Sequence, residues 1–393
     1  MKSIALILFA ALASAACSDD DAAPGGTCAN CVGADSGSDA AADAASADAT
    51  TDGAMDAGPD ASDAPFDAAA DCALLVQGLG VAESDLDGYP PYALAECRLA
   101  YVAKSGELRE RDLESGVELS VAPASEKPRR PAMAQDVLAW EAEVAGKSVV
   151  RVRHSGVVTT LSGSFDHARE PRAAGNVVAF TAFFGATDDS DSDIFLYDAQ
   201  TQSALNLSNA KAQQRFADVS ATHVAWSDFA EDPAGTYAGD GTSLADIVLY
   251  DRGTQQSITL KQQGKQAFPM LGVGGRIGYL EWLEVHPVPK LQDYRIMSLP
   301  LQDLAAAPTL VAAVQSDVAV RPAAVGARVE WVVRSGGKSS LLRAPLDGSS
   351  VAQIVDLGGV AEVHAPAGTA ALSVVATRSV ANGTPSLRAL AVP

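Results

Sequence analysis

The sequence predicts an all-β protein, a β-propeller with seven blades. A strand pattern recurs seven times along the chain, at intervals of roughly 40–53 residues. Six of the copies divide into four short strands and the seventh into three, and four strands are typical of a propeller blade. No stretch has the periodicity of an amphipathic helix of three turns, so we expect almost no helix.

The third strand of the repeat is clearest in two neighbouring copies. Residues 193–198 read Asp-Ile-Phe-Leu-Tyr-Asp, and residues 246–251 read Asp-Ile-Val-Leu-Tyr-Asp. Each follows a short apolar strand that ends in an aromatic residue, Phe180 or Trp226. Each precedes a polar turn and a further apolar strand, so one repeat contains a meander of antiparallel strands.

The same order of strands can be followed through all seven copies. The first strand begins near a proline, or near Ala217 in one copy, and the second ends in a bulky apolar residue. These strand pairs span residues 91–101, 131–140, 171–180, 217–226, 269–279, 322–331 and 366–375. Third strands are expected at residues 107–113, 149–154, 193–198, 246–251, 294–299, 341–345 and 387–392. Fourth strands are expected at residues 117–121, 157–161, 204–207, 257–260, 309–311 and 351–355.

The ends of the repeat region predict how the ring closes. The seventh copy has no fourth strand, whereas the apolar segment 73–76 precedes the first copy and belongs to no repeat. We expect this N-terminal strand to complete the last blade. The closure removes two strand edges at once, and exposed edges promote aggregation. We therefore expect residues 72–393 to form one propeller and a monomer.

Residues 1–16 have the composition of an export signal. Lys2 precedes an apolar run that is too short to span a bilayer, and small residues lead to Cys17. This ending resembles a bacterial lipobox, although Ser14 stands where leucine is usual. The resemblance implies lipidation at Cys17, with Ser18 favouring the outer membrane or cell surface. The alternative is cleavage after Ala15 and a periplasmic or secreted protein.

Residues 17–71 form a predicted disordered tether. Between residues 18 and 71 there are thirteen aspartates and no lysine, arginine or glutamate. Few apolar residues are available for burial, and the like charges repel one another, so a solvated spacer is expected. A weak calcium-collecting or partner-binding tail is the alternative. The formal charge of the whole chain is −21, which argues against nucleic-acid binding.

Five cysteines are present, which is an odd number for an exported chain. Cys28 and Cys31 lie in the tether, without a second pair that would complete a zinc site, so a local disulfide is expected. Cys72 and Cys97 flank the first strands and are expected to pair. Cys17 then remains for lipidation.

Several repeats resemble those of TolB-type propellers, relatives of the WD-repeat fold. The residues that carry the resemblance are Glu170-Pro171, residues 178–180 and 193–198, Ala225-Trp226, residues 246–251, Arg321-Pro322 and residues 329–331. The glycine turn of that family is degenerate here, at residues 172–175. The resemblance implies a propeller over residues 72–393 and a binding role in the cell envelope, and it carries over no catalytic residue.

Arginines near the start of the first strands form one candidate site. Arg129, Arg169 and Arg215 lie one or two residues before the start of the first strand in neighbouring repeats, and Arg321 directly precedes Pro322. If the first strand is innermost, these residues gather at one mouth of the channel. They could hold an anionic ligand or a partner's carboxylate. Inter-blade pairing with acids such as Glu170 is the alternative.

A second candidate site is a run of acidic residues between two strands. Asp189, Asp191 and Asp193 alternate like the first ligands of a calcium loop. Ile194 and Gln200 occupy the positions where an EF-hand requires glycine and glutamate, so an exposed acidic hairpin is the alternative. We expect no other cofactor. The insertion of residues 228–245 occupies the corresponding hairpin of the next repeat.

Together these features favour a lipid-anchored propeller that binds or scaffolds a protein partner in the bacterial envelope. The first alternative is an exported hydrolase, lyase or glycan-binding protein, which a pair of carboxylates in a deep pocket would support. The second is a structural surface protein. No catalytic residue can be assigned from the sequence, so an enzyme is the less favoured reading.

Overall fold

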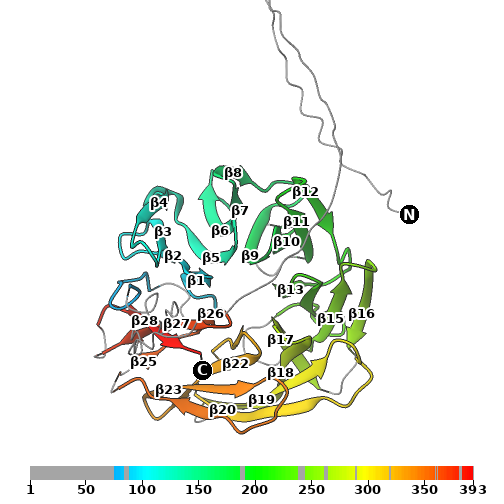
Figure 1. The fold of residues 1–393 in the computed structure, drawn as a ribbon. Coiled ribbons are helices and arrows are strands. Elements are labelled where there is room, and N and C mark those ends of the chain that lie inside the picture. Colours follow the sequence, from blue (N-terminus) through cyan, green and yellow to red (C-terminus); the bar gives the residue numbers. More distant parts are fainter. Residues whose placement is uncertain are drawn as a thin grey trace, which may run out of the picture. The chain divides into compact units, whose positions relative to one another are not determined.

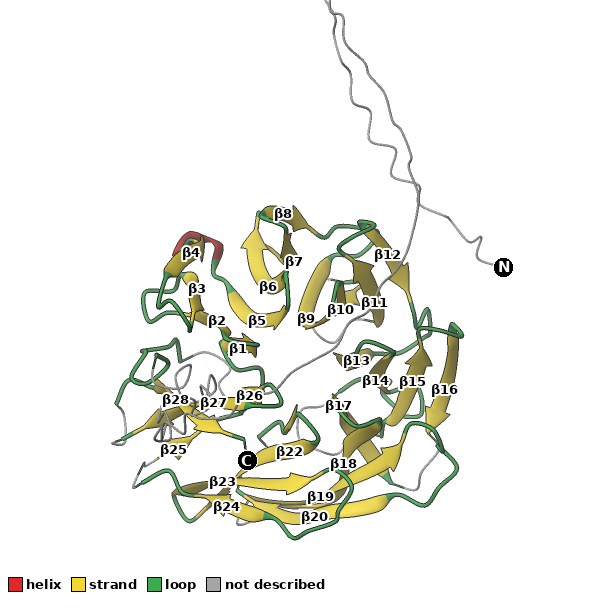
Figure 2. Ribbon diagram, viewed as in Figure 1, coloured by secondary structure: helices red, strands yellow, loops and turns green. Residues whose placement is uncertain are grey.

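The computed structural model describes residues 75–83, 88–185, 191–237, 244–260, 264–287, 290–317, 320–358, 360, 362–379 and 383–392. Contacts divide the chain into residues 1–62 and residues 63–393, and all described residues belong to the second unit. The predicted export signal, the tether and Cys17, Cys28, Cys31 and Cys72 lie outside the described residues. Figures 1 and 2 show seven antiparallel sheets arranged around a ring.

The seven sheets follow one another along the chain. Blade 1 holds β1 (Tyr92–Ala95), β2 (Arg98–Val102), β3 (Leu108–Asp112) and β4 (Glu118–Ala122), and blade 2 holds β5 (Arg129–Ala134), β6 (Val137–Val144), β7 (Lys147–His154) and β8 (Val157–Thr160). Blade 3 holds β9 (His167–Ala174), β10 (Val177–Phe183), β11 (Ser192–Asp198) and β12 (Ser203–Asn206), and blade 4 holds β13 (Gln214–Val219), β14 (His223–Asp228), β15 (Asp246–Asp251) and β16 (Gln256–Leu260).

The remaining three blades continue the pattern. Blade 5 holds β17 (Lys265–Gly272), β18 (Arg276–Pro287), β19 (Lys290–Pro300) and β20 (Thr309–Ser316), and blade 6 holds β21 (Ala323–Val325), β22 (Arg328–Ser335), β23 (Lys338–Pro345) and β24 (Gln353–Val355). Blade 7 holds the divided first strand β25 (Glu362–Val363) and β26 (Ala367–Gly368), then β27 (Leu372–Arg378) and β28 (Ser386–Ala391). The predicted all-β, seven-bladed propeller is therefore confirmed.

Helical structure in the described residues amounts to one 3₁₀ turn, η1 (Ala124–Glu126), between blades 1 and 2. This agrees with the expectation of almost no helix. Within the same residues, no helix has the length and apolar character needed to cross a bilayer.

The aromatic residues that end the predicted second strands form the core between blades. Trp140, Phe180, Trp226, Tyr279 and Trp331 are all fully or almost fully buried. A propeller packs both faces of each sheet against neighbouring blades, so its central strands are apolar on both sides; β10, for example, is buried at every position. The outermost strands instead leave apolar side chains in solvent, among them Leu119, Leu205 and Leu310.

The N-terminal segment closes the ring by pairing with the last strand, β28. The amide of Gly78 donates to the carbonyl of Leu387 at 3.1 Å, and the amide of Leu387 donates to the carbonyl of Leu79 at 2.8 Å. The pairing involves residues 78–81, slightly later than the predicted segment 73–76. Residues 75–78 form a turn, and Val76 contributes its buried side chain to the core rather than its backbone to the sheet.

Blade 5 has the longest hairpin, and the predicted third strand at residues 294–299 was too short. The strands β18 and β19 pair from Arg276 opposite Pro300 to Pro287 opposite Lys290. Proline lacks a backbone amide donor and usually interrupts a central strand, so the sequence did not indicate that the strands continue this far. Pro287 and Pro300 lie at strand ends, where the missing donor is tolerated.

Candidate binding sites on the proline face and in the channel

A recurring backbone feature opens the first strands of blades 2 to 5. The residue directly before the recurring proline, or before Ala217, has a positive φ: Arg130 at 50°, Glu170 at 60°, Phe216 at 58° and Phe268 at 55°. The strand register shifts at each of these positions, as expected for a β-bulge. We call the face of the ring at which these strands begin the proline face.

Side chains of the preceding blade hold the bulges in place. The amide of Glu170 donates to Glu141 Oε1 at 2.7 Å, from blade 3 to blade 2. The amide of Phe216 donates to Glu170 Oε2 at 3.3 Å, and the amide of Phe268 donates to Ser227 Oγ at 3.1 Å. Each bond satisfies a buried backbone donor and couples one blade to the next.

Arg129, Arg169 and Arg215 occupy the same register in their blades. They lie opposite Glu141, Thr181 and Ser227 on the respective second strands. Equivalent positions in neighbouring blades lie at the same end of the first strand, so all three belong to the proline face.

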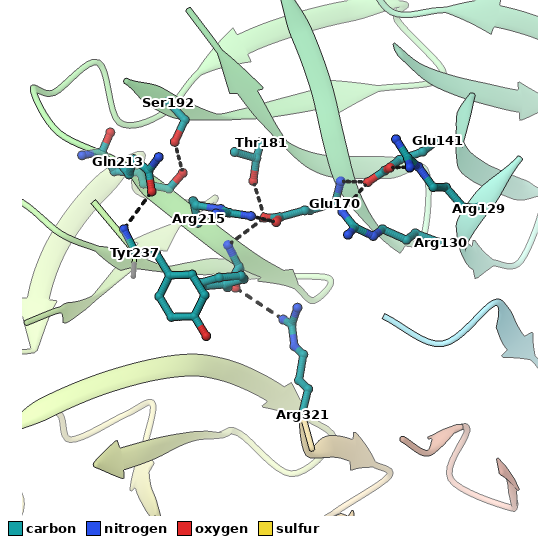
Figure 3. A network of polar contacts seen from close by, with 12 residues as sticks. Arg129, Arg130, Glu141, Glu170, Thr181, Ser192, Gln213, Arg215, Tyr237 and Arg321 are labelled. Atoms are coloured by element: carbon teal, nitrogen blue, oxygen red, sulfur yellow. Dashed lines mark hydrogen bonds and ion pairs between the residues drawn. The ribbon is translucent and has the colours of Figure 1, made fainter. Parts of the chain in front are cut away.

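The arginines of this face take part in pairing within and between blades. Arg129 Nε lies 2.8 Å from Glu141 Oε2, and Arg215 Nη2 lies 2.5 Å from Glu170 Oε1, across the interface of blades 3 and 4. Figure 3 shows Glu170 near the middle of the network, in contact with Arg215, and Glu141 at its right-hand side beside Arg129. The Arg169 guanidinium lies 5.8 Å from the Phe183 ring. Arg215 thus takes part in the inter-blade pairing considered above as the alternative, whereas Arg129 pairs with an acid of its own blade.

Glu170 is the central acid of this network. Its side chain has no exposed surface. Burial would raise its pKa, but the charges of Arg215 and Arg130, with hydrogen bonds from Arg215 and the Phe216 amide, outweigh burial and lower the pKa to about 2. The carboxylate is therefore ionised in the folded protein at neutral pH.

Arg321 lies one register position further along, directly before Pro322, and its side chain points to the channel. Its guanidinium lies 4.6 Å from the centre of the Tyr89 ring, and those of Arg130 and Arg172 lie at 4.7 and 4.9 Å. Three cations thus surround one buried aromatic ring. Tyr89 belongs to the segment that leads into β1, and the sequence analysis did not identify it.

The middle of each first strand contributes one residue to a ring around the channel. The equivalent positions are Ala93, Ala132, Arg172, Asp218, Met270, Ala323 and Ala367. All seven line a cavity of about 150 Å³ at the centre of the propeller. The ring is therefore small and apolar, apart from two neighbouring charged residues in blades 3 and 4.

Both charged members of the ring are perturbed by their position. Burial and the nearby charge of Arg321 lower the pKa of Arg172 to about 10. Burial raises the pKa of Asp218, although the Arg172 charge and the Leu271 amide act in the opposite direction. That amide donates to Asp218 Oδ2 at 2.7 Å. Both residues could have been located from the repeat, because Arg172 directly follows Pro171 and Asp218 directly follows Ala217 at the equivalent position.

Three successive blades extend their second-to-third strand connections at the proline face. These are the connections β10–β11, β14–β15 and β18–β19, in blades 3, 4 and 5. Phe184 and Leu244, in the described parts of the first two connections, are 38% and 37% exposed, and Leu283, within strand β18 of blade 5, is 48% exposed. The acidic hairpin of blade 3 and the insertion of blade 4 could be located from the sequence, whereas the extended hairpin of blade 5 could not.

The connection in blade 4 is anchored at the channel. Its Tyr237 ring lies 4.7 Å from the Phe216 ring, and the Tyr237 amide donates to Gln213 Oε1 at 2.9 Å. Gln213 is buried, and its backbone amide donates to the backbone carbonyl of Gly235. The described part of this loop therefore has a fixed position on the scaffold.

The acidic run of blade 3 lies partly outside the described residues, including Asp189. Asp191 is exposed, whereas Asp193 is buried and accepts hydrogen bonds from Asn206 Nδ2 at 2.7 Å and Ser208 Oγ at 3.0 Å. Asp193 thus orders the turn after β12. No group of three potential metal-ligating residues occurs within the described part of the chain, and the calcium hypothesis stays a prediction.

Cys97 forms a disulfide. The other four cysteines lie outside the described residues, so its predicted pairing with Cys72 stays a prediction.

No protein-family model and no curated protein matches this chain by sequence. Solved structures do match its fold. The propeller domain of the trilobed protease from Pyrococcus furiosus, described as having an open velcro topology, superposes with a TM-score of 0.56 and 8% identity, over 79% of this chain and 93% of that chain. A prolyl endopeptidase structure gives a TM-score of 0.53 and 16% identity, over 83% of this chain and 52% of that chain.

TolB from Acinetobacter baumannii is also similar, with a TM-score of 0.42 and 16% identity, over 66% of this chain and 64% of that chain. The chain thus spans less than two thirds of that TolB and about half of the prolyl endopeptidase. At these identities the comparisons show the β-propeller fold, which is the part of the predicted resemblance that they confirm.

Proposed function

We propose that this protein is an exported, lipid-anchored propeller that binds a protein partner through the proline face of blades 3 to 5. The observation that carries the proposal is a set of three exposed apolar side chains on neighbouring blades at this face: Phe184 and Leu244 in connections, and Leu283 in β18. Function gathers on loops that a rigid scaffold positions, and protein interfaces are built around apolar anchors within a polar surround.

The arrangement of acids supports a binding module over a hydrolase that uses two carboxylates. In the described residues, Glu141, Glu170 and Glu330 are buried and paired with arginines. Asp218 is the acidic member of the cavity lining. A retaining or inverting mechanism needs two carboxylates on either side of the scissile bond. The described cavity supplies one.

Affinity capture from detergent-solubilised envelopes tests the partner. We expect the full-length protein to retain one partner at a fixed stoichiometry. The triple variant Phe184→Ser, Leu244→Ser, Leu283→Ser is expected to lose at least tenfold of that partner, because it removes the apolar anchors while leaving the core intact.

The matched control changes apolar residues of similar exposure on the outermost strands: Leu119→Ser, Leu205→Ser and Leu310→Ser, at 55%, 52% and 51% exposed. This variant is expected to retain the partner. Equal retention by both triple variants contradicts binding at the proline face.

The lipid anchor makes a separate prediction. Cys17→Ser removes the thiol that receives the lipid, so the protein is expected to move from the membrane fraction to the soluble exported fraction and to lose metabolic labelling with palmitate. Cys28→Ser, which changes a tether cysteine, serves as the control and is expected to remain in the membrane fraction. Continued membrane association and labelling of Cys17→Ser would refute the anchor.

A further inference from the structure

Two arginines line the cavity in the centre of the ring, and one of them leaves a buried donor without a partner among the described residues. The Arg321 side chain is 6% exposed, and its Nη1 has no hydrogen-bond partner in the described structure. Its Nη2 reaches the carbonyl of Phe216 at 3.5 Å, the limit of a hydrogen bond. Arg172 lines the same cavity and makes no hydrogen bond or ion pair with the described residues. The protein therefore leaves guanidinium donors available to a ligand.

The charges around the cavity favour an anion. Arg172 and Arg321 repel each other, which contributes to the lowered pKa of Arg172. Asp218 supplies one negative charge, but the amide of Leu271 already occupies its Oδ2. Of the charged residues that line the cavity, two are cations and one is a carboxylate, so the lining carries one positive charge in excess. Burying such a charge without a partner is costly, and an anion would remove that cost.

The size and the walls of the cavity restrict the anion. The cavity has a volume of about 150 Å³, comparable to an engineered protein cavity that binds benzene, so its ligand is a small molecule. Apart from the charged pair, the ring consists of Met270 and four alanines, which offer apolar walls and no hydrogen-bond donors from their side chains. Planar guanidinium groups match the two oxygens of a carboxylate.

We propose that the cavity binds a small monocarboxylate between the guanidinium groups of Arg172 and Arg321, with the short apolar end of the ligand against the alanines. The Tyr89 ring, which packs over both guanidiniums at 4.9 and 4.6 Å, holds them in place. This site lies inside the ring and is separate from the proposed protein-binding connections.

Isothermal titration of the full-length protein tests the proposal, with acetate as the probe and acetamide as its neutral isostere, in a buffer without other carboxylates. We expect saturable binding of acetate at one site and no saturable binding of acetamide. Arg172→Met and Arg321→Met are each expected to weaken acetate binding at least tenfold. Asp218→Asn is expected to strengthen it severalfold, because the variant removes a repelling charge and keeps an oxygen for the Leu271 amide.

The control is Arg295→Met, which removes an exposed arginine paired with Glu281 and is expected to leave acetate binding unchanged. Wild-type affinity in Arg172→Met, or weaker binding in Asp218→Asn, overturns the proposal. Absence of acetate binding, or equal binding of acetamide, overturns it with the wild-type protein alone, so the test does not depend on the folding of a variant. None of these results alters the outcome of partner capture.

Discussion

Glu170→Gln is expected to destabilise the folded protein by about 3 kcal/mol at pH 7, the free energy that corresponds to its lowered pKa. The variant leaves Arg215 without its carboxylate at the interface of blades 3 and 4, and it weakens the acceptor for the Phe216 amide. Removing one partner of a buried pair is costly because the other charge stays buried. Denaturant unfolding of both proteins measures the difference.

The difference in free energy of unfolding between the wild-type protein and Glu170→Gln is also expected to depend on pH. The pKa of Glu170 is lower in the folded than in the unfolded state, so its contribution is complete above about pH 5 and is lost as the pH falls from 4.5 towards 2. Asp218 titrates in both proteins and cancels from the comparison. Glu143→Gln, at an exposed pair with Lys127, is the control and is expected to change stability by less than about 0.5 kcal/mol. A pH-independent difference would contradict the pairing.

Val81→Asp is expected to cost at least about 4 kcal/mol, because it places a charge at a fully buried position of the segment that closes the ring. The Val81 amide donates to the carbonyl of Pro385, and residue 81 also bridges to Ala103 in blade 1. A charge at position 81 is expected to separate the N-terminal segment from β28, the strand of blade 7 with which it pairs. Hydrogen exchange is expected to show loss of protection at Leu387, whose amide bonds to Leu79.

Val157→Asp on the outer strand β8 is the control, because Val157 is 62% exposed. It is expected to change stability by less than about 0.5 kcal/mol. If the two variants are equally stable, the N-terminal segment does not close the ring.

The blade pattern could be predicted from the sequence because it depends on local properties of the chain. Alternating apolar strands, polar turns and a terminal aromatic recur in each copy, and the missing fourth strand of the seventh copy pointed to closure by the N-terminal segment. The register of Arg129, Arg169 and Arg215 followed from the same repeat. The Arg215–Glu170 pair across blades 3 and 4 agrees with the pairing considered as an alternative, whereas the pair of Arg129 with Glu141 inside blade 2 was not predicted.

The charged residues of the channel were not predicted from the sequence. The predicted site residues precede the recurring proline, whereas Arg172 and Asp218 directly follow Pro171 and Ala217 and line the cavity. The bulge at Glu170 displaces the strand register, so the direction of each side chain could not be derived from simple alternation. Tyr89 lies outside the repeats, and no periodic signal indicated that it would pack against three arginines.

Site-specific photo-crosslinking in intact cells tests the central claim most directly. A photoreactive side chain would be introduced singly at Phe184, Leu244 or Leu283, and, for comparison, at Leu119, Leu205 or Leu310. Binding at the proline face predicts one crosslinked protein species shared by the first three positions and absent from the other three. Crosslinks of equal yield at both sets, or only at the outermost strands, would contradict a protein-binding surface on blades 3 to 5.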